Sequence, residues 1–131
     1  MKKNNFTTIE NIINVSKKGG MFILVDDKKR ENEGDLIIST SDSNAKHINF
    51  MAKYGRGLIC LALDSVQAKK LNLSLMSPVN QSRNKTAFTV SIEAKKGITT
   101  GISARDRAKT IKVASKKNVK KNEIVSPGHV F

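Results

Sequence analysis

The stretch Met21-Phe-Ile-Leu-Val-Asp-Asp-Lys-Lys-Arg-Glu-Asn-Glu-Gly-Asp-Leu-Ile-Ile38 sets the fold of the first third of this chain. Its first five residues are apolar and β-prone, which predicts a buried strand over 21–25. Residues 36–38 predict a second strand. The ten residues between them are polar and contain Gly34, so they predict a loop that a rigid strand holds at one end of a sheet.

This loop carries an unusual concentration of acidic residues. Five of the eleven Asp and Glu residues lie in it, although 24 Lys and Arg give the whole chain a formal net charge of +13. Their mutual repulsion is costly unless cations, a metal ion or hydrogen bonds compensate it. Those five residues are Asp26, Asp27, Glu31, Glu33 and Asp35.

Two interpretations of the acidic loop follow from its residues alone. Carboxylates at 31, 33 and 35 would point to one side of an extended segment. Hard oxygen ligands there suit Mg²⁺ or Mn²⁺, which take one or two protein carboxylates together with substrate oxygens. Arg30 would then bind phosphate or balance the acids. The alternative is a solvated acidic turn without a ligand.

The remaining pattern mixes helices with strands. Apolar spacing and capping residues predict helices within 1–20, ending at Gly19-Gly20, and over 43–53, about 64–71 and 104–114, the last capped by Ser103. Apolar or alternating runs predict a buried strand over 57–63 and a strand over 86–92, with a loop over 72–84. We expect one α/β or α+β domain, in which a mixed β-sheet packs with helices.

Composition excludes several protein classes. The 131 residues are enough for one core and are 38% hydrophobic, which is typical of a globular chain. No apolar run approaches the roughly 20 residues of a membrane span, and no signal-peptide core follows the N-terminus. A single cysteine rules out an internal disulfide. We therefore expect a cytoplasmic protein with no membrane partner.

The positive charge raises the alternative of a small RNA- or ribosome-binding module. Only five of the 24 basic residues are arginine, the aromatic residues are sparse, and lysine doublets are spread along the chain. We therefore expect no nucleic-acid partner. The lysines form either a solvated surface or a basic patch that attracts an anionic substrate.

Three further residues are candidates for chemistry. Thr100 lies in a turn before a helix N-terminus, where backbone N–H groups and hydroxyls can hold a phosphate, although an ordinary capped helix start gives the same pattern. His129 follows Pro-Gly near the end of the chain and is either a proton carrier or an exposed histidine. Cys60 lies in the predicted buried strand, which favours an inert core thiol.

Five ordered motifs together resemble the 3,4-dihydroxy-2-butanone 4-phosphate synthase family. The resemblance runs from about residue 8 to the last residue. The motifs are Val25-Asp-Asp-Lys-Lys-Arg-Glu-Asn-Glu-Gly-Asp-Leu36, Gly57-Leu-Ile-Cys60, Thr86-Ala-Phe-Thr-Val-Ser-Ile92, Thr99-Thr-Gly-Ile-Ser-Ala-Arg-Asp-Arg107 and Pro127-Gly-His-Val-Phe131.

The resemblance implies a lyase of riboflavin biosynthesis. Its reaction converts D-ribulose 5-phosphate into L-3,4-dihydroxy-2-butanone 4-phosphate and formate, with two Mg²⁺ (or Mn²⁺) ions, in a homodimer whose active sites lie at the subunit interface. Glu31 is implied as a metal ligand that also touches substrate. His129 is implied as catalytic, and Glu33 and Asp26 as residues that transfer protons or hydrogen-bond to the groups that bind metal. The residues implied to bind substrate are Arg30, Asp35, Cys60 and Thr100, besides Glu31.

The resemblance also implies parts that these residues do not contain. In the family, a metal-binding histidine within Gly-His-Thr-Glu-Ala and a later catalytic glutamate follow the histidine that matches His129. We therefore expect residues 1–131 to be a synthase domain that is incomplete at its C-terminus, either a part of a longer polypeptide or a degenerate remnant. We expect them to bind metal weakly and to show little activity alone. Robust formate release by this chain would contradict that expectation.

Overall fold

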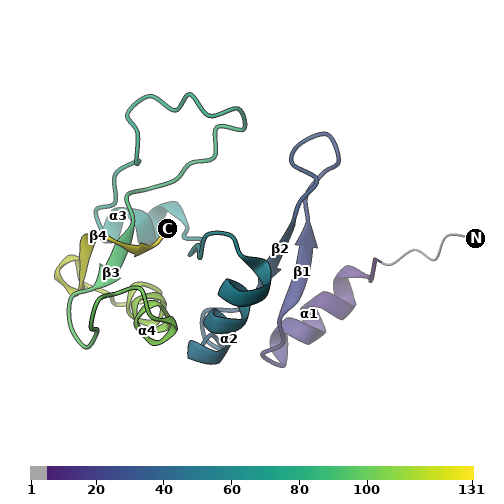
Figure 1. The fold of residues 1–131 in the computed structure, drawn as a ribbon, viewed down its shortest axis with the longest axis horizontal. Coiled ribbons are helices and arrows are strands. Elements are labelled where there is room, and N and C mark those ends of the chain that lie inside the picture. The colour runs from purple at the N-terminus through teal and green to yellow at the C-terminus, as the bar shows by residue number, and fades with distance from the viewer. Residues whose placement is uncertain (1–5) are drawn as a thin grey trace, which may run out of the picture. The chain divides into compact units, whose positions relative to one another are not determined.

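The computed structural model describes residues 6–131 (Figure 1), and the chain divides into two compact units whose boundary in the sequence lies between Asp42 and Ser43. Each unit is described by itself. Residues 1–5 of the predicted N-terminal segment lie outside the described part. None of the helices over residues 6–131 has the length and apolar character needed to span a bilayer.

The first unit consists of one helix and a two-stranded sheet. Helix α1 spans Ile9–Lys17, and the Thr8 hydroxyl caps it by accepting a hydrogen bond from the Asn11 N–H at 3.3 Å. Strand β1 (Phe22–Val25) pairs antiparallel with β2 (Gly34–Ile37), so that the two strands form a hairpin around the acidic loop. The predicted helix and both strands are confirmed.

The predicted burial of β1 is wrong within this chain. The side chains of Ile23 and Leu24 are 61% and 58% exposed. A two-stranded ladder with a single helix has too little apolar area to cover both of its faces.

The second unit holds the core. Its helices are α2 (Ala45–Phe50), continued by a π-helical turn over Met51–Gly55, α3 (Ser65–Lys70) and α4 (Ala104–Ala114), with a short 3-10 helix over Lys121–Glu123. Strands β3 (Ile92–Ala94) and β4 (Ile124–Val130) pair antiparallel. The buried apolar side chains come from α2, α4, both strands and the segments between them, and they include Ile48, Ile59, Leu71, Ile92, Ile111, Ile124 and Val130.

The predicted cap of α4 is confirmed. Ser103 caps α4, because its hydroxyl accepts from the Asp106 N–H at 3.0 Å, and Asp64 caps α3 in the same way. Helix α2 begins at Ala45, two residues after the predicted start at 43. There Asn44 is the cap, and its Oδ1 accepts from the backbone N–H groups of the next turn. Ser43 directly precedes Asn44, and serine and asparagine have similar preference for the cap position, so the sequence does not distinguish the two.

The two remaining strand predictions need correction. Residues 57–63 form no regular strand, although the Leu61 N–H donates to the Phe131 carbonyl at 2.7 Å and the Phe131 N–H donates to the Ile59 carbonyl at 3.1 Å. The predicted strand over 86–92 shrinks to one bridge between Thr89 and Leu75, and β3 begins only at Ile92.

These pairings settle the fold class. Helices and strands mix, as predicted, but the described strands form two separate antiparallel pairs, β1–β2 and β3–β4, where the sequence predicted one mixed sheet. The apolar run over 57–63 is fastened to the chain end by two hydrogen bonds and contributes no full ladder.

Candidate functional site

The acidic loop of the first unit is a tight, internally bonded turn. The Asp26 N–H donates to the Glu33 carbonyl at 3.0 Å, and the Arg30 and Asn32 N–H groups both donate to the Asp27 carbonyl. Asn32 has a positive φ of 52°, which reverses the chain. The prediction of an extended segment is therefore wrong at its start: residue 31 lies in the turn and residue 35 in β2.

Asp26 anchors this turn. Its Oδ2 accepts from Arg30 Nη1 at 2.7 Å and from the Glu31 N–H at 3.1 Å, while its Oδ1 accepts from the Asp27 N–H. Burial raises the pKa of Asp26, but the hydrogen bonds from Arg30 and from these backbone groups outweigh it and hold the pKa below 3.8. An ionised carboxylate with three donors is suited to a positioning role in the turn rather than to proton transfer.

Arg30 offsets part of the negative charge of the acidic loop, which is one of the two roles that the sequence predicted for it. Its Nη1 contacts Asp26 and also lies 3.1 Å from Glu31 Oε2. All three side chains are at least partly open to solvent, so these pairs order the loop more than they stabilise the fold. The structure therefore brings Asp26, Arg30 and Glu31 together in one cluster.

The donor set of this cluster fits a hard divalent cation only in part. Over residues 6–131 there is no group of three or more His, Cys, Asp or Glu side chains placed to hold a metal ion. Glu33 and Asp35 are exposed beside the turn. A single carboxylate such as that of Glu31, supplemented by substrate oxygens, is still an arrangement that Mg²⁺ commonly adopts.

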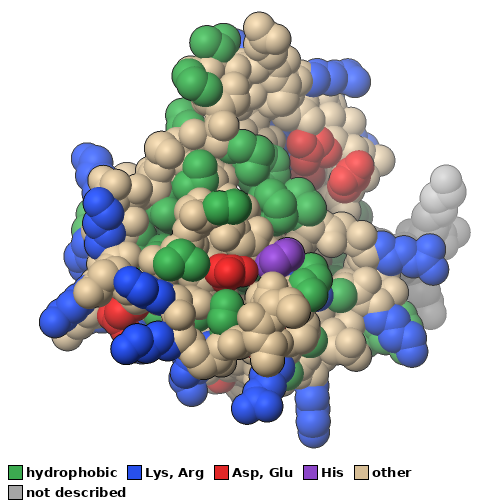
Figure 2. All heavy atoms as spheres, turned by 60° about the vertical axis from the view of Figure 1, so that its left-hand side comes forward, with side chains coloured by type: hydrophobic (Ala, Val, Ile, Leu, Met, Phe, Trp, Pro, Cys, Tyr) green, Lys and Arg blue, Asp and Glu red, His purple; other side chains and the backbone are tan. Residues whose placement is uncertain are grey.

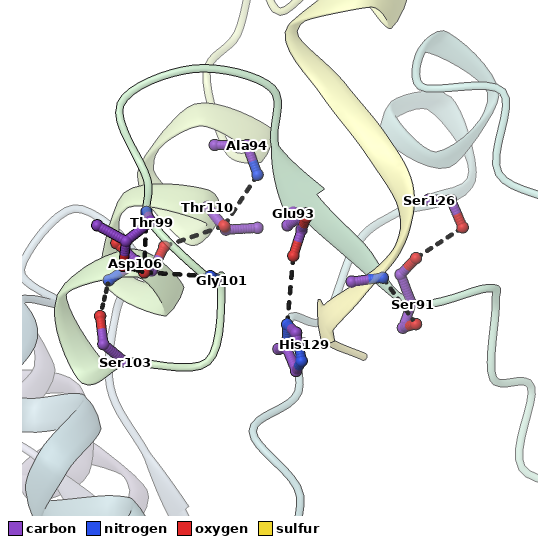
Figure 3. A network of polar contacts seen from close by, with 11 residues as sticks. Ser91, Glu93, Ala94, Thr99, Gly101, Ser103, Asp106, Thr110, Ser126 and His129 are labelled. Atoms are coloured by element: carbon purple, nitrogen blue, oxygen red, sulfur yellow. Dashed lines mark hydrogen bonds and ion pairs between the residues drawn. The ribbon is translucent and has the colours of Figure 1, made fainter.

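In the second unit, the loop before α4 is organised by one buried carboxylate (Figure 3). Asp106 is 3% exposed, and its Oδ2 accepts from the Thr99 N–H, the Thr99 hydroxyl and the Gly101 N–H at 3.2, 2.8 and 3.1 Å. The Thr99 and Gly101 N–H groups, which the sequence offered to a phosphate, are thus already satisfied inside the protein. Thr100 itself is exposed between them.

This network makes a pH-dependent contribution to stability. The Thr99 hydroxyl holds the pKa of Asp106 below its ordinary 3.8; burial opposes this, and the Thr99 and Gly101 N–H groups reinforce it. A lowered pKa means that the stabilisation is fully present above 3.8 and is lost as the pH falls through the lower folded-state value.

We expect Asp106→Asn to lower the midpoint of thermal unfolding by about 5 °C or more near neutral pH, because an amide cannot accept three donors as well as a carboxylate does. Thermal unfolding should be followed by circular dichroism between about pH 7 and pH 3. The difference in unfolding midpoint between the variant and the unmodified chain should decrease as the pH falls. A difference in unfolding midpoint that stays constant down to the lowest pH would contradict the assigned role of the carboxylate.

His129 lies in β4 beside an acidic residue that sequence reasoning missed. Its Nδ1 is 3.2 Å from Oε2 of Glu93 in β3, as Figure 3 shows. In the space-filling view a histidine and an acidic side chain touch among hydrophobic side chains (Figure 2). The available signal was an acid between two apolar residues, Ile92 and Ala94, both of which are buried.

The remaining predicted residues are spread over both units. Cys60 is exposed, so the interpretation as a buried core thiol is wrong; its predicted strand does not form. The structure thus yields two clusters, Asp26–Arg30–Glu31 in the first unit and Glu93–His129 in the second. The other predicted residues are exposed in their own units and comprise Glu33, Asp35, Cys60 and Thr100.

Comparison with known proteins gives one consistent family. The family model described as 3,4-dihydroxy-2-butanone 4-phosphate synthase matches residues 10–131. The Pseudomonas aeruginosa protein of that name is 49% identical over 95% of this chain, and the Aquifex aeolicus riboflavin biosynthesis protein RibBA is 51% identical over 96%. The Vibrio cholerae synthase is 45% identical over 95% of the chain.

Solved structures agree with this result. A 3,4-dihydroxy-2-butanone 4-phosphate synthase in complex with two magnesium ions superposes with a TM-score of 0.92 at 36% identity, covering 96% of this chain and 59% of that one. A two-domain synthase from A. baumannii gives 0.89 at 44% identity, covering 95% of this chain and 37% of that one. The chain spans 34%, 32% and 57% of the lengths of the Pseudomonas, Aquifex and Vibrio relatives.

Proposed function

Because the chain belongs to the 3,4-dihydroxy-2-butanone 4-phosphate synthase family, we propose that it acts in the lyase reaction of riboflavin biosynthesis. D-ribulose 5-phosphate would be the substrate, and L-3,4-dihydroxy-2-butanone 4-phosphate and formate the products. The observation that carries the proposal is the family match over residues 10–131, which includes both the Arg30–Glu31 pair and His129.

The reaction needs a proton removed beside a carbonyl, loss of water, a skeletal shift and release of formate. A bound pair of Mg²⁺ or Mn²⁺ ions supplies polarisation of the carbonyl and hydroxyl oxygens. Glu31 is the residue of this chain that would hold metal, and the magnesium complex of a relative supports the choice of ion. Arg30 keeps the Glu31 carboxylate ordered through their 3.1 Å contact.

His129 is the residue that would carry protons. An imidazole exchanges protons near neutral pH, and the ring of His129 is 41% exposed, so a ligand can reach it. Asp26 holds the turn in place. We assign Glu33, in addition to His129, a role in proton transfer. We assign substrate contacts to Arg30, Glu31, Asp35, Cys60 and Thr100.

The oligomeric state and the cellular location belong to the same proposal. The family resemblance favours a homodimer, and a biosynthetic reaction on a phosphorylated sugar favours the cytoplasm. A soluble sugar phosphate is the partner, and the dispersed lysines attract it without specific contacts.

Exchange of substrate hydrogens into D₂O tests the proposed function through its first step. Residues 1–131 alone are expected to release little formate, but the first proton transfer precedes that release and can be measured separately. With Mg²⁺ present, the chain should exchange the carbon-bound hydrogens beside the carbonyl of ribulose 5-phosphate faster than buffer does, as followed by proton NMR. His129→Asn should slow this exchange by about 100-fold or more, the usual contribution of a general base. His47→Asn is the matched control, because His47 lies in α2 and has no role in the proposed chemistry. Exchange no faster than in buffer, or equally fast in both variants, would refute the proposal.

A further inference from the structure

The pairing of β3 with β4 gives His129 a defined neighbour. Ile92 pairs with Val130, but the next residue, Glu93, pairs with Val125, so the ladder shifts and residues 126–129 bulge out of the pairing. Two hydrogen bonds to Ser91 fix the bulge: the Ser126 hydroxyl donates to its carbonyl at 2.8 Å, and the Gly128 N–H donates to its hydroxyl at 3.2 Å. This irregularity places Nδ1 of His129 3.2 Å from the Glu93 carboxylate.

Glu93 is less exposed than the ring it contacts. Its side chain is 22% exposed against 41% for that of His129, and its strand neighbours Ile92 and Ala94 are buried. The carboxylate is therefore the more enclosed member of the pair.

Gly101, in the loop before α4, lies against the Glu93–His129 pair. It is buried with a φ of +85°, and a Cβ built on it would overlap Glu93 Oε2 and lie 2.8 Å from His129 Nδ1. Because the Asp106 carboxylate accepts from the Gly101 N–H, the backbone at 101 is itself fixed. The pair therefore lies against a rigid backbone surface that only glycine permits.

The chemistry of the contact selects one form of the ring. An ionised carboxylate only accepts hydrogen bonds, so the 3.2 Å contact requires the hydrogen on Nδ1. In the neutral ring this leaves the lone pair on Nε2, which is then the nitrogen able to take a proton.

We propose that Glu93 is a positioning residue that fixes the Nδ1–H tautomer of His129 and so presents Nε2 as the proton-accepting atom. The role of Nε2 in the reaction rests on the proposed function, whereas the tautomer is a property of the protein alone.

Nitrogen-15 NMR of the labelled chain tests this assignment without substrate. The chain has two histidines, and His47→Gln identifies the signals of His129. At about pH 9, where an imidazole is neutral, His129 should show a protonated Nδ1 and a bare Nε2. Glu93→Leu, which removes the acceptor while keeping a side chain of similar size, should abolish the Nδ1–H signature and shift the hydrogen to Nε2. Glu93→Gln should weaken it, since the amide can accept or donate.

Glu123→Gln is the control for these variants, because Glu123 pairs with Lys116 instead and the tautomer should not change. A bare Nδ1 in the unmodified chain, or an Nδ1–H signature that survives in both Glu93 variants, would overturn the inference. Failure of the proposed function would appear differently, as absent hydrogen exchange with the tautomer intact. Exchange that depends on His129 without the Nδ1–H tautomer would leave the function standing and remove the role of Glu93.

Discussion

Gly128→Ala is expected to unfold the second unit or to leave it severely destabilised. A Cβ at position 128 would overlap the carbonyl of Ile92 and the nitrogen of Glu93, which are backbone atoms inside β3. A flexible side chain can move away from such a clash, but a paired strand cannot. We expect the free energy of unfolding to fall by about 3 kcal/mol or more, a large share of the roughly 5–15 kcal/mol of a typical domain.

Urea unfolding followed by circular dichroism measures this loss. Gly57→Ala is a matched control, because a Cβ at position 57 meets no atom within 4 Å and the substitution should change stability little. Equal unfolding midpoints for the two variants would show that β4 does not pack on β3 as described. The same substitution should also disturb the bulge that carries His129.

Glu31→Gln is expected to abolish the dependence of ribulose 5-phosphate binding on Mg²⁺. The amide keeps the size of the side chain but loses the charge that attracts a hard cation. It also removes one of the two ionic partners of Arg30, the one at 3.1 Å, while Asp26 remains. Isothermal titration calorimetry of the sugar phosphate, with Mg²⁺ and with EDTA, measures the effect.

Asp27→Asn provides the control for charge alone. It removes one negative charge from the same turn, at a carboxylate that accepts from the Lys29 N–H and that has no assigned role in binding. Asparagine can accept the same hydrogen bond, so the turn should persist and Mg²⁺ should still enhance binding. An equal loss in both variants would assign the effect to the net charge of the loop instead of to Glu31.

Local signals predicted the elements that local interactions form. The hairpin around 26–33, the cap at Ser103 and the helix start at Asp64 each depend on residues within one or two turns of each other. Arg30 as the counterion of the acids was predictable for the same reason, since it lies four residues from Asp26.

Features that depend on distant pairing were not predictable. The apolar run over 57–63 has the composition of a buried strand, but a strand needs a continuous partner, and in the described residues two hydrogen bonds join this run to Phe131 without a regular ladder. Glu93 and His129 are 36 residues apart in the sequence. A register shift between β3 and β4 brings them together, and no sequence pattern encodes that shift. The Asp106 N–H donates to the predicted cap Ser103, but its carboxylate accepts from the more distant Thr99 and Gly101, so the loop and the helix start are bonded together.

The affinity of the chain for Mg²⁺, measured by calorimetry with and without ribulose 5-phosphate, tests most directly whether the acidic loop holds a divalent ion together with a phosphorylated ketose. Binding linkage is reciprocal, so if the ion and the sugar share a site, the sugar must tighten Mg²⁺ by the same factor by which Mg²⁺ tightens the sugar. We predict a gain of about 10-fold or more that disappears in Glu31→Gln. An Mg²⁺ affinity that does not change with the sugar phosphate, or an increase in affinity that persists in Glu31→Gln, would contradict a shared site at the acidic loop.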